Sequence, residues 1–156
     1  MTDPQDVVTV ERLIPAEADA IFELIAHPSR HQEIDGSGTV RSAKGPAKDD
    51  RMALGSKFGM SMKMGVPYAM TSTVIEFEEA RRLAWQTRGP GPLGALVGGR
   101  IWRYQLEPVE GGTLVKESWD ISQEAALTKL AIKGLAKKTA ENMSATLARI
   151  EQILTA

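Results

Sequence analysis

The sequence has no cysteine, which excludes disulfide bonds, thiolate nucleophiles and cysteine-based metal sites. It also lacks a basic surplus: 19 lysines and arginines stand against 20 aspartates and glutamates, so the charge does not favour nucleic acid as a partner. No apolar run reaches the roughly 18 residues that span a membrane. The polar, acidic start does not resemble a secretory signal. We therefore expect a cytoplasmic protein without stable membrane insertion.

The residues that are present have the composition of one globular domain. Of the 156 residues, 42% are hydrophobic and 25% are charged. This length suits a single domain. We expect one domain over residues 1–156, with its core at 7–154, because no repeat or low-complexity tract divides the chain.

The order of the periodic segments begins with a strand and two short helices. Residues 7–14 are rich in β-branched side chains and predict a strand. The first helix carries Ile21, Phe22 and Ile25 on one face, and the second extends from Pro28 to Asp35. Turn residues then separate six further strand candidates. These lie at 39–44, 55–64, 68–78, 82–88, 101–109 and 113–121.

The last third of the chain changes to a helical period. Its apolar stripe consists of Ala136, Ala140, Met143, Leu147, Ile150 and Leu154. Gly134 predicts a break between a short leading segment and the long final helix. Sequential strands with tight turns favour an antiparallel sheet, and an amphipathic helix must bury its stripe against one face of it. We therefore predict an α+β fold in which a curved antiparallel sheet wraps around a long C-terminal helix, with two short helices after the first strand.

This order resembles the START/Bet v1-like (SRPBCC) superfamily, and within it the polyketide cyclase/dehydrase and lipid-transport group. The residues that carry the resemblance are the segments 15–22, 27–31, 82–85, 111–115 and 117–120, and the likeness extends from Val7 to Leu154. The resemblance implies a helix-grip fold with a central cavity for lipids, polyketides or other apolar ligands. It does not imply one activity, because members of one fold family differ in function.

Alternating methionines are the first candidate feature of a ligand site. Phe58, Met60, Met62 and Met64 occupy every second position of one predicted strand, so all four face the same side. Methionine is flexible and polarizable and suits apolar surfaces that adapt to different ligands. The stripe is either core packing or the wall of a cavity, and the family resemblance favours the wall.

A long apolar loop is the second candidate feature. Residues 89–99 are rich in glycine and proline, carry no charge and include four aliphatic side chains. Loops are usually polar, so a loop with this many apolar side chains suggests a specific role. Leu93, Leu96 and Val97 could form a lid over a cavity mouth. A dimer contact, a membrane contact during ligand uptake and a loosely packed insertion are the alternatives.

The tryptophans and one carboxylate form the third candidate feature. Trp85, Trp102 and Trp119 all fall on predicted strands. If Trp102 faces the core, so does Tyr104, and if Trp119 does, so does Glu117. A buried Glu117 without a partner would have a raised pKa, and it could act as an acid or base or hold the polar end of a ligand. Alternatively, Glu117 lies near the sheet edge and reaches solvent, or pairs with an arginine.

The two histidines predict no metal site. His27 and His31 are four residues apart, but the residues between them do not form the His-Glu-x-x-His motif, and no third ligand is near in sequence. We expect a capping or surface role for both histidines, and neither a metal nor a cofactor.

Three functional hypotheses follow. The first is binding, and possible transport, of a hydrophobic small molecule (a lipid, fatty acyl chain or aromatic polyketide) in an internal cavity. Its contacts would come from Phe58, Met60, Met62, Met64, Trp85, Trp102, Tyr104, Trp119, Met143 and Leu147. The second is a polyketide cyclase or dehydratase in which Glu117 or Tyr104 moves a proton. The third is a non-catalytic module that dimerises through residues 89–99. Monomer and homodimer both stay open.

Overall fold

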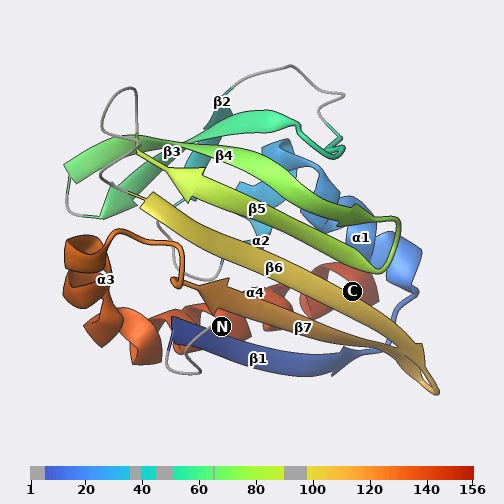
Figure 1. Ribbon diagram of the computed structural model, residues 1–156. Helices are drawn as coiled ribbons and strands as arrows, with labels where there is room; N and C mark the ends of the chain where they lie inside the picture. Colours follow the sequence, from blue (N-terminus) through green and yellow to red (C-terminus); the bar gives the residue numbers. More distant parts are fainter. Residues whose placement is uncertain (1–5, 36–39, 45–50, 65, 90–97) are drawn as a thin grey trace.

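The computed structural model describes residues 6–35, 40–44, 51–64, 66–89 and 98–156, without the side chains of Ser29, Gln32, 40–44 and 60–69. Seven strands and a few helices make up these residues (Figure 1). The strands are β1 (Val7–Ile14), β2 (Val40–Lys44), β3 (Lys57–Met64), β4 (Val66–Glu78), β5 (Arg82–Arg88), β6 (Gly98–Val109) and β7 (Gly112–Asp120). The helices are α1 (Ala18–Ala26), η2 (Pro28–Arg30), α2 (His31–Ile34), α3 (Ala126–Ile132), η4 (Lys133–Leu135) and α4 (Ala136–Thr155).

The strands form one antiparallel sheet in the order β1-β7-β6-β5-β4-β3-β2. From β2 to β7, each strand pairs with its neighbour in sequence, as short connections favour. The first strand joins the last along its whole length, from Val7 opposite Asp120 to Ile14 opposite Thr113. The long helix α4 crosses one face of the sheet and packs on β1 and β7, with α1 and α2 beside it (Figure 1). The predicted α+β helix-grip architecture is confirmed.

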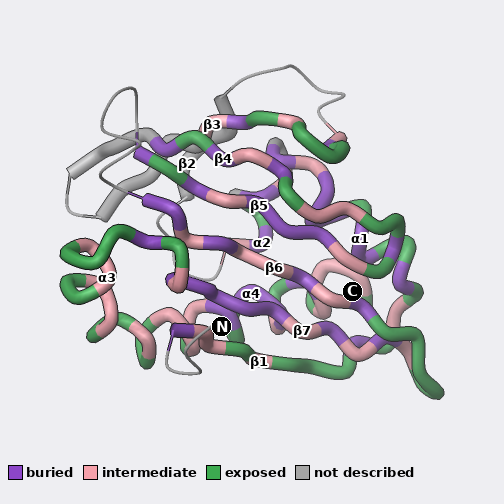
Figure 2. The backbone as a smooth tube through the Cα atoms, in the orientation of Figure 1, coloured by how far each residue is buried: buried purple, intermediate pink, exposed green. Residues whose placement is uncertain are grey.

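Alternation along the strands divides the sheet into an inner and an outer face (Figure 2). Residues directly opposite each other in an antiparallel pair point to the same face. One inner row contains the three tryptophans in direct register, Trp119 opposite Trp102 and Trp102 opposite Trp85. The next inner row places Glu117 opposite Tyr104. The predicted facing of Trp102 with Tyr104, and of Trp119 with Glu117, is therefore confirmed.

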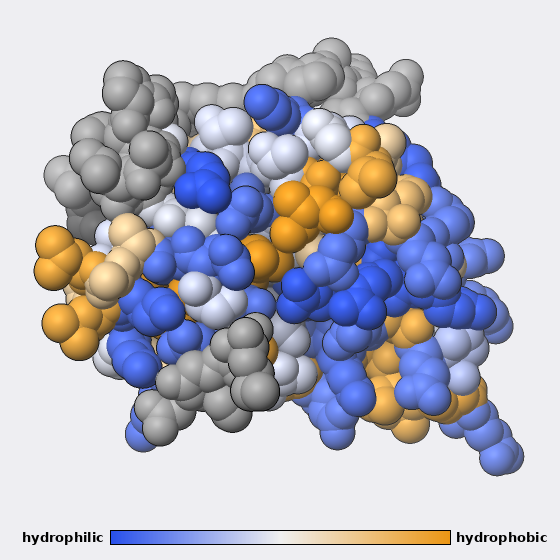
Figure 3. Space-filling model, in the orientation of Figure 1, coloured by the Kyte–Doolittle hydropathy of each residue, from blue (hydrophilic) through white to orange (hydrophobic). Residues whose placement is uncertain are grey.

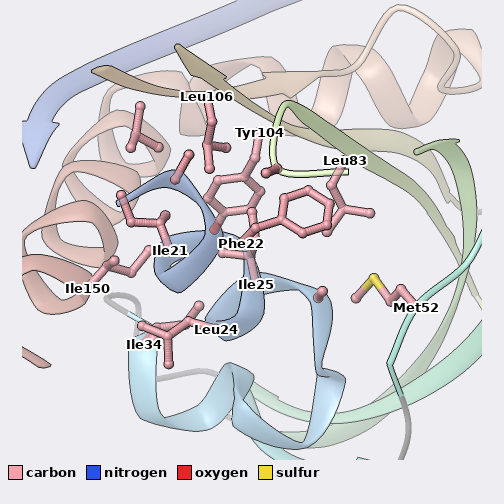
Figure 4. Close-up of a cluster of buried hydrophobic side chains, with 14 of the residues drawn as sticks. Ile21, Phe22, Leu24, Ile25, Ile34, Met52, Leu83, Tyr104, Leu106 and Ile150 are labelled. Carbon is pink, nitrogen blue, oxygen red and sulfur yellow. The ribbon is translucent and has the colours of Figure 1, made fainter. Parts of the chain in front are cut away.

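The core lies between the inner face and the helices. The stripe of α4 is buried at Met143, Leu147 and Ile150, as predicted. Tyr104 and Leu106 extend from the sheet into a cluster with Phe22 and other side chains of α1 (Figure 4). Each large apolar side chain that is fully buried here contributes roughly 1.5–3 kcal/mol.

The outer face is charged instead (Figure 3). Glu76 accepts hydrogen bonds from Arg82 and, at 2.6 Å, from Arg103, which also lies 3.7 Å from Asp120. These ion pairs occupy Arg82 and Arg103. No helix in the described part of the chain is both long and apolar enough to cross a membrane.

The final helix is interrupted where the glycine predicted a break. Helix α3 ends at Ile132, a 3-10 turn occupies Lys133–Leu135, and α4 begins at Ala136. None of the side chains of α3 is buried. The break therefore separates a solvent-exposed segment from the helix that completes the core.

Strand β6 begins earlier than the sequence indicates. The apolar stretch 89–99 ends inside this strand, because Gly98 and Gly99 belong to it with φ near +115°. A Cβ on Gly99 would lie 2.5 Å from the carbonyl oxygen of Gln123. Only glycine permits this backbone conformation and this close approach. Because glycine is also common in loops, the sequence predicted a loop at Gly98 and Gly99.

We predict that Gly112→Ala destabilises the fold by at least about 2 kcal/mol. Gly112 has φ +151°, and a Cβ there would lie 2.1 Å from the carbonyl oxygen of Ile14. Gly134→Ala is the matched control, because nothing lies within 4 Å of its Cβ position. We expect that control to be neutral or to stabilise by about 0.5–1 kcal/mol. Urea denaturation of both variants tests this, and equal effects would contradict it.

Candidate functional site

The most unusual group on the inner face is the carboxyl of Glu117. Strand β7 lies between the edge strand β1 and β6, so Glu117 is not on an edge strand, and it is only 4% exposed. It pairs in register with Val10 on one side and Tyr104 on the other. The interpretation of Glu117 as a solvent-reaching edge residue is wrong, because the pairing of the first strand with the last covers β7. Among the described side chains, the partner of Glu117 is Tyr104 and not an arginine.

One oxygen of this carboxyl has a partner and the other does not. The Tyr104 hydroxyl donates a hydrogen bond to the Glu117 carboxyl. Within the described part of the chain, Oε1 of Glu117 has no hydrogen-bond partner. A buried carboxyl oxygen without a partner costs about 1–3 kcal/mol in lost hydration. This atom is therefore able to bind a polar group of another molecule.

The environment changes the acidity of both side chains. Burial raises the pKa of Glu117 from 4.5 to about 8, the Tyr104 hydrogen bond acts in the opposite direction, and the negative charge of Asp35 adds to the rise. Burial also raises the pKa of Tyr104 well above its usual value of 10, and the neighbouring Glu117 contributes to that. At neutral pH, Glu117 is therefore mostly a neutral carboxylic acid that can donate a hydrogen bond.

Tyr104, the partner of this carboxyl, belongs to a group of aromatic rings from three strands and one helix. The His31 ring stacks on Trp85 with 5.1 Å between ring centroids, and Phe58 meets both rings edge-on at 5.8 Å. Tyr104 lies 5.8 Å from Trp85 in a tilted arrangement. We call His31, Phe58, Trp85, Tyr104 and Glu117 the inner cluster.

Of the predicted capping or surface role, the surface alternative is wrong for His31, which instead caps a carbonyl in the last turn of α1, whereas His27 fits a surface role. His31 is buried, and its Nε2 lies 2.9 Å from the carbonyl oxygen of Ile25. A carbonyl can only accept, so Nε2 carries the proton in this hydrogen bond. His27 instead pairs with Glu23 at 2.9 Å on the surface of α1. In the described part of the chain, no group of three His, Cys, Asp or Glu side chains could hold a metal ion.

Other candidate residues divide between two apolar clusters. Trp119 and Met143 pack with Ile121 in one, Leu147 belongs to the main core, and Trp102 touches both. The side chains of Met60, Met62 and Met64, and the proposed lid residues Leu93, Leu96 and Val97, lie outside the described residues. Their roles stay predictions, as does an internal cavity.

Two residues of the site, Asp35 and His31, were not recognised from the sequence. Asp35 was interpreted only as the end of a helix, yet its charge reaches both Glu117 and Tyr104. His31 was considered in the sequence only as a possible metal ligand together with His27, and the same capping or surface role was then expected for both. The spacing of three between His31 and the buried Ile34 is the signal that could have placed the imidazole on the inner face.

A curved antiparallel sheet that holds one long helix defines a helix-grip fold. Residues 5–155 match the family described as polyketide cyclase / dehydrase and lipid transport, and the chain belongs to that family. The predicted superfamily resemblance is thereby confirmed.

Relatives and solved structures agree with this assignment. Rv0088 from Mycobacterium tuberculosis is 35% identical over 144 residues, which cover 88% of this chain and 59% of that protein, so the chain spans less than two thirds of this relative. The crystal structure of CV1439 from Chromobacterium violaceum has a TM-score of 0.70 at 13% identity and covers 97% of this chain and 98% of its own. DynU16, from the dynemicin biosynthetic locus, has a TM-score of 0.66 at 15% identity over 98% of this chain and 48% of its own. At these identities, the two structures show the fold alone.

We predict that Glu117 makes the fold less stable as the pH rises from about 5 to 8. The unfolded side chain ionises near 4.5 and the folded one near 8. Between these values the folded state keeps a proton that the unfolded state has lost, so the free energy of unfolding falls by up to ~1.4 kcal/mol per pH unit from this group. Above pH about 8 this contribution levels off.

Denaturation curves between pH 5 and 9 measure this effect, with Glu117→Gln as the test variant. The variant should lose the pH dependence that this carboxyl causes. Glu107→Gln on the exposed end of β6 is the control and should retain it. Identical slopes in the wild type and Glu117→Gln would contradict the burial of an acid with a raised pKa.

Proposed function

We propose that this protein binds a hydrophobic small molecule, such as a lipid, fatty acyl chain or aromatic polyketide, between the inner face of the sheet and α4. The observation that carries the proposal is the unpartnered Oε1 of Glu117 within a buried aromatic and aliphatic environment. The family description, which includes lipid transport and polyketide cyclases, supports the same ligand class. The absence of cysteine fits the cytoplasm as the place of action.

Apolar contact would supply most of the binding energy. The inner face offers aromatic rings from β3, β5, β6 and β7 and aliphatic side chains from α4. Burial of a ligand against them contributes about 25 cal/mol per Å², before the costs of ordering. The described members of the proposed contact set are Phe58, Trp85, Trp102, Tyr104, Trp119, Met143 and Leu147.

Charge around the inner cluster favours a ligand whose polar end is neutral. Glu117 and Asp35 are both acids, and the charge of Asp35 already acts on Glu117. Among the described arginines, Arg103 pairs with Glu76 on the outer face and Arg100 pairs with Glu124 at 2.9 Å. A carboxylate next to the neutral Glu117 would lie near the negative charge of Asp35, with neither of these arginines to balance it, so a hydroxyl, ketone or ester is the better fit.

We predict that dodecanol binds at least about tenfold more tightly than dodecanoate at pH 7. The alcohol can hydrogen bond to Oε1 of Glu117, whereas the carboxylate adds a negative charge near Asp35. Titration with tryptophan fluorescence as the readout measures both affinities, because Trp85 is part of the inner cluster.

Native mass spectrometry of freshly purified protein gives an independent measurement, since an endogenous apolar ligand should remain bound. Glu117→Gln should weaken dodecanol binding, and Glu107→Gln should not. Failure of both amphiphiles to bind, together with no extractable ligand, would overturn the proposed function.

A second candidate function is catalysis in the same place. A carboxyl whose pKa lies near 8 beside a tyrosine hydroxyl is suited to general acid-base chemistry at neutral pH. A polyketide cyclase or dehydratase would use Glu117 to move a proton while the apolar walls orient a flexible chain.

We predict that Glu117→Gln distinguishes a carrier from an enzyme. With a linear 1,3-diketone as the test compound, an enzyme would lose at least about a hundredfold in kcat with little change in affinity, because an amide cannot exchange the proton. Its wild-type rate would change with pH near 8. A carrier would show no turnover in either protein, and Glu107→Gln should match the wild type in both assays.

A further inference from the structure

Helix α3 carries large apolar side chains that are exposed to solvent. Leu127 is 84% exposed and Leu130 is 74% exposed, and Leu135 follows in the adjoining turn. None of the side chains of α3 or η4 is buried. Figure 3 shows apolar side chains at the left edge of the molecule, where Figure 1 places α3. We call residues 126–138 the leucine-lysine segment.

Lysines surround these leucines. Lys129, Lys133, Lys137 and Lys138 follow within the same segment, which contains no acidic residue. Lys138 is 3.9 Å from Glu141 and has a side chain that is 71% exposed. The segment therefore combines projecting apolar side chains with a cluster of positive charge.

Asp6 and Glu141 offset part of this charge, so the four lysines stand against two paired acids. Asp6 lies 3.0 Å from Lys129 and 3.8 Å from Lys133, but it is buried beneath them. Glu124, just before α3, is also buried and pairs with Arg100. The solvent-facing side of the leucine-lysine segment therefore keeps a positive surplus.

We propose that the leucine-lysine segment docks the protein on an anionic lipid surface. Leucines that project from a short helix can enter the acyl boundary of a bilayer, while lysines beside them bind anionic headgroups. A protein partner would favour a broad, flat patch or a groove, whereas these leucines sit on a projecting turn of helix (Figure 1).

The position of the segment allows docking without disturbing the core. The ion pairs with Asp6 attach α3 to the body of the domain, and the 3-10 turn at Lys133–Leu135 separates it from α4. The helix that completes the core, with Met143 and Leu147, lies beyond this turn. Contact with a membrane therefore involves side chains that the fold does not need.

Vesicle co-sedimentation tests the proposal, with vesicles of phosphatidylcholine alone and vesicles that also contain phosphatidylserine. The wild type should bind the phosphatidylserine vesicles at least about tenfold more strongly, and added salt should weaken this binding. The double variant Leu127→Ser/Leu130→Ser should lose about tenfold or more in affinity. Lys137→Glu/Lys138→Glu should lose at least as much on anionic vesicles only.

Matched controls separate docking from general surface effects. Leu54→Ser removes a leucine that is 68% exposed on the turn before β3, and Lys57→Glu reverses an exposed charge on β3. Both controls should bind vesicles like the wild type, and all variants should keep the wild-type unfolding temperature, since none of these side chains is buried.

Several outcomes would overturn docking on an anionic surface. These are no sedimentation with either vesicle, equal binding to both vesicles, or equal loss in the controls. A concentration-dependent dimer in sedimentation velocity that Leu127→Ser/Leu130→Ser abolishes would assign the segment to a second copy of the chain instead. Because these assays contain no small ligand, their result does not depend on whether the inner cluster binds one.

Discussion

The antiparallel pairing of β1 with β7 is the constraint on which the rest of the structure depends. It joins the beginning of the described chain to the strand that precedes the C-terminal helices, along eight residue pairs. Without this pairing β7 would be an edge strand, and Glu117 would have water on one side. With it, the carboxyl lies in the interior of the sheet and faces α4. The burial of one acidic group, and the acidity that follows from it, are thus consequences of topology.

The local pattern of the sequence predicted much of this fold because the relevant signals are periodic. Alternation along 101–109 and 113–121 correctly placed Tyr104 on the face of Trp102 and Glu117 on the face of Trp119, but not which face this is, and Gly134 correctly marked the break before α4. These features depend on neighbours within a few residues. The start of β6 was misplaced because Gly98 and Gly99 have the composition of a loop but the hydrogen bonding of a strand.

The composition of the site was harder to predict, because it depends on long-range register. The three tryptophans lie in one row only because the lengths of two hairpins place them opposite each other. His31 reaches Trp85 because a single short helix folds back over the sheet, and four residues of helix carry too little periodicity to reveal its direction. The influence of Asp35 on Glu117 likewise joins residues that are far apart in sequence.

The inner cluster contains a group that lowers the stability of the fold. A leucine at position 117 would suit the apolar environment better than a carboxyl with one unpartnered oxygen. Local departures of this kind are typical of sites where a protein binds or reacts.

The open sheet leaves β1 as an edge strand, and this has a consequence for self-association. A long edge with unpaired backbone groups can recruit a strand from another molecule and begin aggregation. On β1 the adjacent charges of Glu11 and Arg12 oppose such recruitment, and Arg12 is held by two hydrogen bonds to Glu151 of α4. Helix α4, which packs on the inner face of the sheet, thus also restrains a charged side chain at its edge and helps to keep other chains from pairing there.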